Sequence, residues 1–452
     1  MLSKSEVLVR SARLIIEKCL GLHYHDAFLL IFDETTRHFP SIFKQAAEEA
    51  QVTYRQVFVS TKHQAAGRHA LPASLLDSLK RSRGILLATT DDERCAQFRI
   101  GLTSDLRQAG TATGTMPGAS LDILSTAIDV DYNEIIRMCR DLTVPLVHGH
   151  KCVVTTKDRQ GKSYILTFAL GGLQRIPIQS YAVIPLDAWG NIPAGETFVA
   201  PLEESANGQY VVNGAIGTEK VTGSKEVVVE FENGRLTRHY YVHSGKPVEH
   251  ILCLKETAGR NSDIGCWNVI AEFGIGVNKK LTKITGVQLI DEKRYGTIHV
   301  AIGNNSGYGG TNRCPSVHCD MTTVGPDVQL DGHELITKGE HVYKLGDFLE
   351  DYLTFNPGPG KEWISSHVSL DKDAYEINSD GDLLVKHITQ SGRRTLYALG
   401  NEMTSKKATE LVRCFKDSTF MVLDDLKRRI PMQEDHFLGL LGLLAKHGVI
   451  LT

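Results

Sequence analysis

Residues 296–321 read GTIHVAIGNNSGYGGTNRCPSVHCDM. The first part, GTIHVAIG, is an apolar run typical of a buried strand, yet His299 lies in its middle, where an unpaired imidazole is costly. A glycine-rich loop follows and ends in His318-x-Asp320. On an extended backbone, residues two apart point to the same side, so these two side chains can share one metal ion. The stretch therefore predicts a β-rich domain that carries a metal site.

Two glutamates upstream also lie within or at the start of apolar runs. Glu272 is inside NVIAEFGIG, and Glu196 begins the strand-like run ETFVAP. One buried histidine is usually satisfied by its neighbours, but several carboxylates and histidines buried together require a cation to neutralise them. We therefore expect a metal-binding set made of Glu196, Glu272, His299, His318 and Asp320.

Length and composition set the frame for this site. A chain of 452 residues is expected to form two or three domains, and 42% hydrophobic with 23% charged residues is average for a soluble globular protein. The net charge of −3, from 50 basic and 53 acidic residues, gives no bias toward nucleic acid or a membrane surface. Nine scattered cysteines with no C-x-x-C pair indicate reduced thiols, so we expect a cytoplasmic protein.

The first part of the chain alternates between strand and helix patterns. AFLLIFDE, VTYRQVFVS and GILLATT are strand-like, and TTRHFPSIFKQAAEEA between the first two is helical. This alternation predicts an N-terminal parallel α/β domain over residues 1–145. The sequence pattern then changes to short strands separated by glycine, asparagine and aspartate turns. The first of these strands form a hairpin that turns at residues 158–161. We expect residues 146–345 to form the β-rich metal-binding domain, for an overall α/β fold class.

A third unit is expected over residues 346–452. It begins near the loop FNPGPGKEW and contains a hairpin pattern, DLLVKHITQSGRRTLYALG. Two helical patterns follow, one after Thr404 and one in DHFLGLLGLLAKHG. This order is similar to a small α+β winged-helix-like module, but the unit lacks the basic surplus of a DNA reader. We expect it to serve docking or dimerisation.

The β-rich motifs resemble a known family, the thermophilic-aminopeptidase family of metallopeptidases of the aminopeptidase T and aminopeptidase S type. The resemblance covers about residues 1–345 and is clearest from 149 to 332. It is carried by GKSYILTFALGG, PAGETFVAP, IAEFGIGVN, DEKRYGTIHVAIG, GG-x-N at 309–312, VHCDM and VQLDG, in the family's order. It implies a metal-dependent aminopeptidase with a peptide substrate, a homodimeric state and a two-metal site built from the same five residues. Zinc, cobalt and manganese all suit such ligands.

Two departures from the family pattern concern chemistry and architecture. The family has a tyrosine soon after the first histidine, thought to steady the transition state. Here Ser306 is near the expected place and Tyr308 lies just beyond it, so Tyr308 is the candidate catalytic residue. The loop between His299 and His318 is also short, and residues from 346 onward have no counterpart in the family.

Two other functions stay open at this point. Ring-cleaving non-haem iron dioxygenases resemble the same fold and use two histidines and one carboxylate, but in that alternative position 272 would be histidine rather than Glu272. The second alternative is a peptide-binding or specialised peptide-processing protein on the aminopeptidase fold. The displaced Tyr308 and the added C-terminal unit motivate it.

Overall fold

The structure is a computed structural model that describes most of residues 3–343. Within that span it leaves out 67–78, 80, 93–94, 96–97, 100, 104–105, 107–110, 172–174, 176, 185 and 187. Beyond residue 343 it describes Arg413 and six short strands: β21 (His367–Leu370), β22 (Tyr375–Ile377), β23 (Leu383–Ile388), β24 (Arg394–Ala398), β25 (Phe420–Val422) and β26 (Ile450–Leu451).

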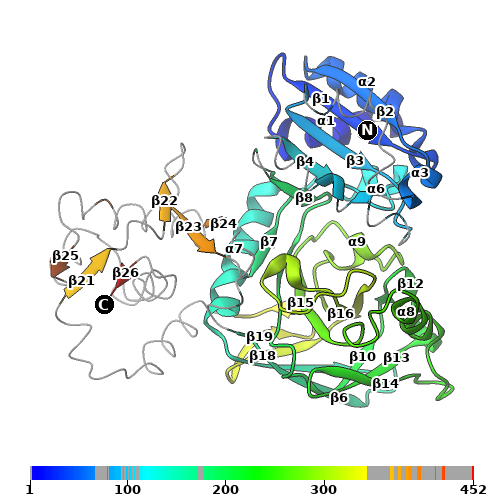
Figure 1. The fold of residues 1–452 in the computed structure, drawn as a ribbon, viewed down its shortest axis with the longest axis vertical. Helices are drawn as coiled ribbons and strands as arrows, with labels where there is room; N and C mark the ends of the chain where they lie inside the picture. Colours follow the sequence, from blue (N-terminus) through cyan, green and yellow to red (C-terminus); the bar gives the residue numbers. More distant parts are fainter. Residues whose placement is uncertain are drawn as a thin grey trace.

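The N-terminal part is built around a five-stranded parallel sheet (Figure 1). In spatial order its strands are β2 (Thr53–Phe58), β1 (Ala27–Phe32), β3 (Gly84–Ala88), β4 (Ala112–Thr115) and β8 (Trp189–Asn191). Its helices include α1 (Lys4–Leu14), which continues into a π-helical turn at Ile15–Cys19, and also α2 (Phe39–Glu49), α3 (Thr61–Ala65) and α6 (Leu121–Thr126). Ser3 and Glu6 form a capping box at the start of α1.

Both faces of the parallel sheet are covered. Phe28 and Leu30 of β1 pack into the cluster that contains the apolar faces of α1 and α2. Leu29 and Ile31, the alternate residues, pack into a second cluster with Phe98 and neighbouring leucines. Parallel sheets are stable when buried on both sides, and this explains why the AFLLIF run is apolar without alternation.

Two antiparallel sheets form the second part and are stacked face to face. The eight-stranded sheet runs β14 (Arg235–Tyr241), β13 (Val227–Glu232), β10 (Asn207–Val212), β6 (Ser163–Ala169), β5 (Lys151–Lys157), β18 (Asp327–Leu330), β19 (His333–Thr337) and β20 (Glu340–His341). The seven-stranded sheet runs β12 (Glu219–Lys220), β11 (Ala215–Ile216), β17 (His318–Val324), β16 (Thr297–Gly303), β15 (Ile270–Gly276), β9 (Glu196–Val199) and β7 (Ile178–Ser180). Figure 1 shows them together below the parallel sheet, with α8 (Glu249–Arg260) at one end.

Aromatic side chains lie between the two stacked sheets. The rings of Phe168 on β6 and Phe273 on β15 have centroids 5.1 Å apart. The Tyr210 hydroxyl on β10 donates to the Met321 carbonyl on β17 at 3.0 Å. At the β7 edge of the seven-stranded sheet, the long helix α7 (Tyr132–His148) lies against β7 and β9, and the Thr197 hydroxyl on β9 donates to the Cys139 carbonyl of the helix at 3.0 Å.

The mixed α/β fold class and the strand patterns of the first two expected units are confirmed. Strand β8 was not expected, because it joins the parallel sheet from well beyond residue 145. The division into units ending at 145 and 345 stays a prediction. The hairpin of the third unit is present as β23 paired with β24, whereas the two expected helices after Thr404 lie outside the described residues, as does most of 346–452. None of the helices that the structure describes combines the length and apolar character needed to cross a bilayer.

Replacing Phe168 with alanine tests the packing between the two sheets. Phe168 is 2% exposed, so Phe168→Ala should lower the free energy of unfolding by about 3–5 kcal/mol through the cavity it leaves. Chemical denaturation measures the change. Ile165→Ala on the same strand is the matched control, because Ile165 is 53% exposed on the opposite face and should change stability by about 0.5 kcal/mol or less. Equal losses for both variants would contradict the stacked arrangement.

Candidate metal centre

All five residues expected to bind metal lie on neighbouring strands of the seven-stranded sheet. Glu196 begins β9, Glu272 is on β15, His299 is on β16, and β17 carries both His318 and Asp320. Side chains alternate between the two faces of a strand. Because residues such as Phe273, Ile298 and Val300 point into the core between the sheets, the five polar residues share the opposite face.

Each of the five polar residues has a small residue beside it on a neighbouring strand. The pairs are Glu196 with Gly276, Glu272 with Ala301, His299 with Gly274, His318 with Gly303, and Asp320 with Ala301. Directly opposed side chains on one face are close neighbours, so a glycine or alanine leaves room for its long polar partner. The clearest case is Gly274, where an added Cβ would lie 2.1 Å from the His299 ring.

Glu272 joins the five residues into two overlapping groups. Its Oε1 atom lies 3.1 Å from Nε2 of His299, which in turn lies 3.8 Å from Oε2 of Glu196. Its Oε2 atom lies 3.5 Å from Nε2 of His318, which lies 3.4 Å from Oδ1 of Asp320. Each group therefore brings two carboxylate oxygens and one imidazole nitrogen together, and Glu272 belongs to both.

These distances fit divalent cations placed within the groups. Oxygen and nitrogen ligands of zinc lie about 2.0–2.2 Å from the ion, which sets neighbouring ligand atoms in a tetrahedral site about 3.4 Å apart. Two of the oxygens, Glu196 Oε2 and Asp320 Oδ1, are buried and have no hydrogen-bond partner among the described residues. Buried carboxylate oxygens without donors are costly, and a cation would satisfy both.

The charges within the cluster shift the titration of its histidines. Burial by itself lowers the pKa of His299, but the hydrogen bond with Glu272 and the charge of Asp320 outweigh it and raise that pKa to about 9. Burial also lowers the pKa of His318, and the Asp320 carboxylate reverses this and raises it to about 10. Burial alone would raise the pKa of Asp320, yet the charge of His318 holds it well below its usual range. The cluster thus attracts positive charge strongly.

Sequence reasoning missed three further residues that contact this cluster. Lys293 is fully buried, and its Nζ atom lies 2.8 Å from Glu196 and 2.5 Å from Glu292. Gln288, the first residue of α9 (Gln288–Asp291), donates a hydrogen bond from Nε2 to Oδ2 of Asp320. In the sequence, Asp291–Arg294 is a run of four charged residues, a pattern typical of a solvated turn, so it gave no sign of burial.

Tyr308, the candidate catalytic residue, borders the second group. It ends the short helix η7 (Ser306–Tyr308), and its hydroxyl donates to the Asn304 carbonyl at 3.1 Å and lies 3.5 Å from Nδ1 of His318. The same carbonyl accepts from Nδ1 of His318 at 2.9 Å, which directs Nε2 of that ring toward the carboxylates. Burial, followed by the charge of Glu272, raises the pKa of Tyr308 well above its usual value.

The cluster is open to solvent on one side. The side chain of His318 is 32% exposed, whereas those of Glu196, Glu272, His299 and Asp320 are at most 7% exposed. A molecule that approaches from solvent therefore meets the group of Glu272, His318 and Asp320 first, beside Tyr308.

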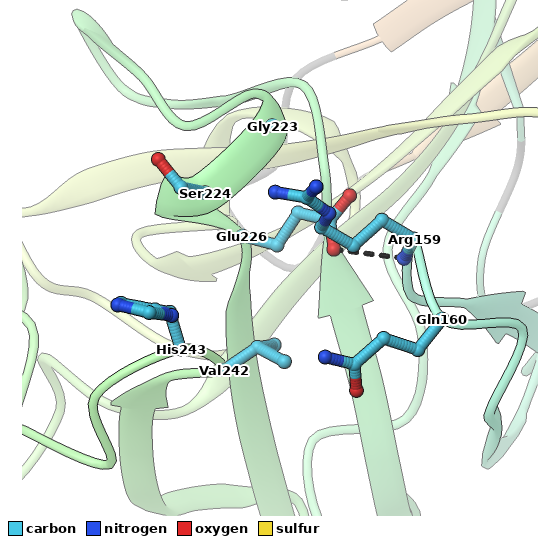
Figure 2. Close-up of a pocket in the computed structure, with 7 residues that line it drawn as sticks. All are labelled: Arg159, Gln160, Gly223, Ser224, Glu226, Val242 and His243. Atoms are coloured by element: carbon cyan, nitrogen blue, oxygen red, sulfur yellow. Dashed lines mark hydrogen bonds between the residues drawn. The ribbon is translucent and has the colours of Figure 1, made fainter.

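A separate hollow lies near the end of the hairpin formed by β13 and β14. It has a volume of about 440 Å³ and is lined by Arg159, Gln160, Gly223, Ser224, Glu226, Val242 and His243. Figure 2 shows the backbone N–H of Arg159 donating to Oε2 of Glu226, at 2.9 Å. The hollow shares no lining residue with the cluster of Glu196, Glu272, His299, His318 and Asp320, and its one carboxylate and one histidine do not form a ligand set.

Comparisons with known proteins give a likeness in structure. No family model matches the chain, and no curated protein matches its sequence. A solved structure, wild-type AmpT from Thermus thermophilus, superposes with a TM-score of 0.53 at 14% identity and covers 75% of this chain and 100% of that one. At this identity the likeness shows a coarse aminopeptidase-like fold.

Adding one methyl group at Gly274 tests the packing of His299. Gly274→Ala should displace the imidazole, lower metal content and reduce the free energy of unfolding by about 1–3 kcal/mol, because the added Cβ overlaps the ring. Elemental analysis and denaturation measure the two effects. Gly259→Ala on α8 is the matched control, because nothing lies within 4 Å of its added Cβ. Unchanged metal content in Gly274→Ala would contradict the role assigned to His299.

Proposed function

We propose that this chain is a metal-dependent aminopeptidase-like hydrolase that releases N-terminal residues from peptides at a two-metal site. The observation that carries the proposal is the position of Glu272, whose two oxygens face two different histidines. A shared carboxylate of this kind suits two cations held close together. The aminopeptidase-like fold of the AmpT structure supports the peptidase class.

In this proposal, the residues of each group have defined roles. Glu196, Glu272 and His299 would hold one divalent ion, and Glu272, His318 and Asp320 would hold the other. When bound, divalent ions supply Lewis acidity toward a carbonyl oxygen and lower the pKa of water. The ligand set contains oxygen and imidazole nitrogen, which suits zinc, cobalt and manganese alike.

The surrounding residues would keep the ligands in place. Lys293 anchors one oxygen of Glu196 and leaves the other facing His299, and Gln288 does the same for Asp320 toward His318. Such outer contacts fix the orientation of ligands and tune their affinity for the ion. Tyr308 lies beside the open side of the cluster, where its hydroxyl can donate a hydrogen bond to the charge that develops on a substrate carbonyl.

The iron dioxygenase alternative receives less support from the same geometry. That chemistry uses one ion with two histidines and one carboxylate, leaving open positions. Here three buried carboxylates surround the histidines, and position 272 is a glutamate that faces both of them. The peptide-binding alternative has the same fold without turnover, so an activity measurement with counted metals separates it.

The main test compares free and blocked peptides. Metal-loaded protein should release the first residue from peptides with a free amino terminus and should leave N-acetylated peptides intact, because an aminopeptidase needs the free amine. Chromatography of the products measures both. Elemental analysis should give at least two ions per chain. Equal cleavage of both peptides would rule out an exopeptidase, one iron per chain would favour the dioxygenase, and two or more ions without turnover would favour the peptide-binding protein.

A charge-removing substitution tests the ligand assignment. Asp320→Asn keeps the shape of the side chain but removes its charge, so it should lower kcat by about 100-fold or more and release at least one ion. Glu256→Gln is the matched control, because Glu256 is an exposed carboxylate on α8 and should keep both activity and metal content. Full turnover with an unchanged metal content in Asp320→Asn would show that Asp320 is not a ligand.

A further inference from the structure

A second cluster of metal-ligand side chains lies in the segments that lead into β15 and β17. Asp263 and Cys266 belong to the turn between α8 and β15, and Cys314 belongs to the loop between η7 and β17. These two segments are far apart in the sequence. One ligand atom from each side chain lies within 4.8 Å of the other two.

The three side chains are held in this arrangement by the local structure. Oδ2 of Asp263 accepts hydrogen bonds from the backbone N–H of Ser316 at 3.1 Å and from its hydroxyl at 2.5 Å. The Cys314 side chain is fully buried and faces Cys266 and Asp263. Cys266 is half-buried, and its thiol donates to the Asp263 carbonyl at 3.2 Å. Thus the carboxylate is fixed, one thiol is enclosed, and the other borders solvent.

We propose that Asp263, Cys266 and Cys314 form a binding site for a thiophilic divalent cation of the zinc type. Two cysteine sulfurs and one carboxylate oxygen are ligands that zinc accepts, and the half-buried side of Cys266 leaves a place for water as the fourth ligand. A carboxylate next to two thiols has no role in a disulfide, whereas it supplies a third ligand to a metal site. This site does not depend on the proposed function of the main centre.

The cation would fasten the loop that carries Tyr308. Cys314 lies four positions before His318, and Cys266 lies six positions before Glu272. Asn312 already ties the two segments by donating to the Cys266 carbonyl at 2.9 Å. A shared ion adds a tie through side chains, so the site is structural rather than catalytic.

Cobalt titration tests the proposal, because cobalt bound to thiolate gives a charge-transfer band that oxygen and imidazole ligands do not give. Reduced, metal-stripped, full-length protein should show this band on adding Co²⁺. Cys314→Ser should lose it, and Asp263→Asn should weaken cobalt binding at this site by about tenfold or more. Cys253→Ser, on an exposed cysteine of α8, should keep the band, and so should Asp320→Asn, since the main centre contains no sulfur ligand.

Alkylation of the unmodified sequence gives a second measurement that no folding defect can confuse. Zn²⁺ should protect Cys266 from iodoacetamide and leave Cys253 reactive, as mapped by mass spectrometry. An absent thiolate band in the reduced wild-type protein would overturn the proposal. So would a band that survives in Cys314→Ser, or alkylation of Cys266 at the same rate with and without Zn²⁺.

Discussion

The buried negative charge on one face of the seven-stranded sheet is the constraint on which the site depends. Glu196, Glu272 and Asp320 are each at most 6% exposed and lie on adjoining strands. Negative charges on adjoining strands are tolerated in a low-dielectric interior only when positive groups lie close to them. The fold supplies a buried lysine and two histidines, and the orientation of the free carboxylate oxygens leaves a place for more positive charge.

The same constraint explains the pairing of small residues with the polar ones. If large side chains stood beside the polar residues on all four of these strands, they would leave no space for imidazole rings. Glycine and alanine beside each polar residue create that space without breaking the ladder of hydrogen bonds, and the opposite face stays apolar to hold the core between the sheets. Strands also fix these polar side chains more firmly than loops would.

Much of this site could be predicted because its residues break a local rule. Glu272 and His299 each stand alone in an apolar run, so the sequence itself shows that something must compensate them. Lys293 and Glu292 obey the local rule, since charged residues in a turn are ordinary, and their burial depends on tertiary packing that no short window contains. The cluster of Asp263, Cys266 and Cys314 could not be predicted from the sequence either, because its members come together only when the strands pair. Strand β8 was not predicted, because an edge strand of three residues is too short to show a periodic pattern.

The route of the chain through β8 has a mechanical consequence. The chain leaves the parallel part after α7, forms the hairpin of β5 and β6, returns to the parallel sheet as β8, and leaves again to begin β9 with Glu196. The chain therefore passes between the two parts more than once. A single protease cut after α7 would leave them covalently joined. Residues 192–195 alone separate the edge of one sheet from the first carboxylate of the other. A displacement of the parallel sheet would therefore shift the backbone of Glu196 through this four-residue link.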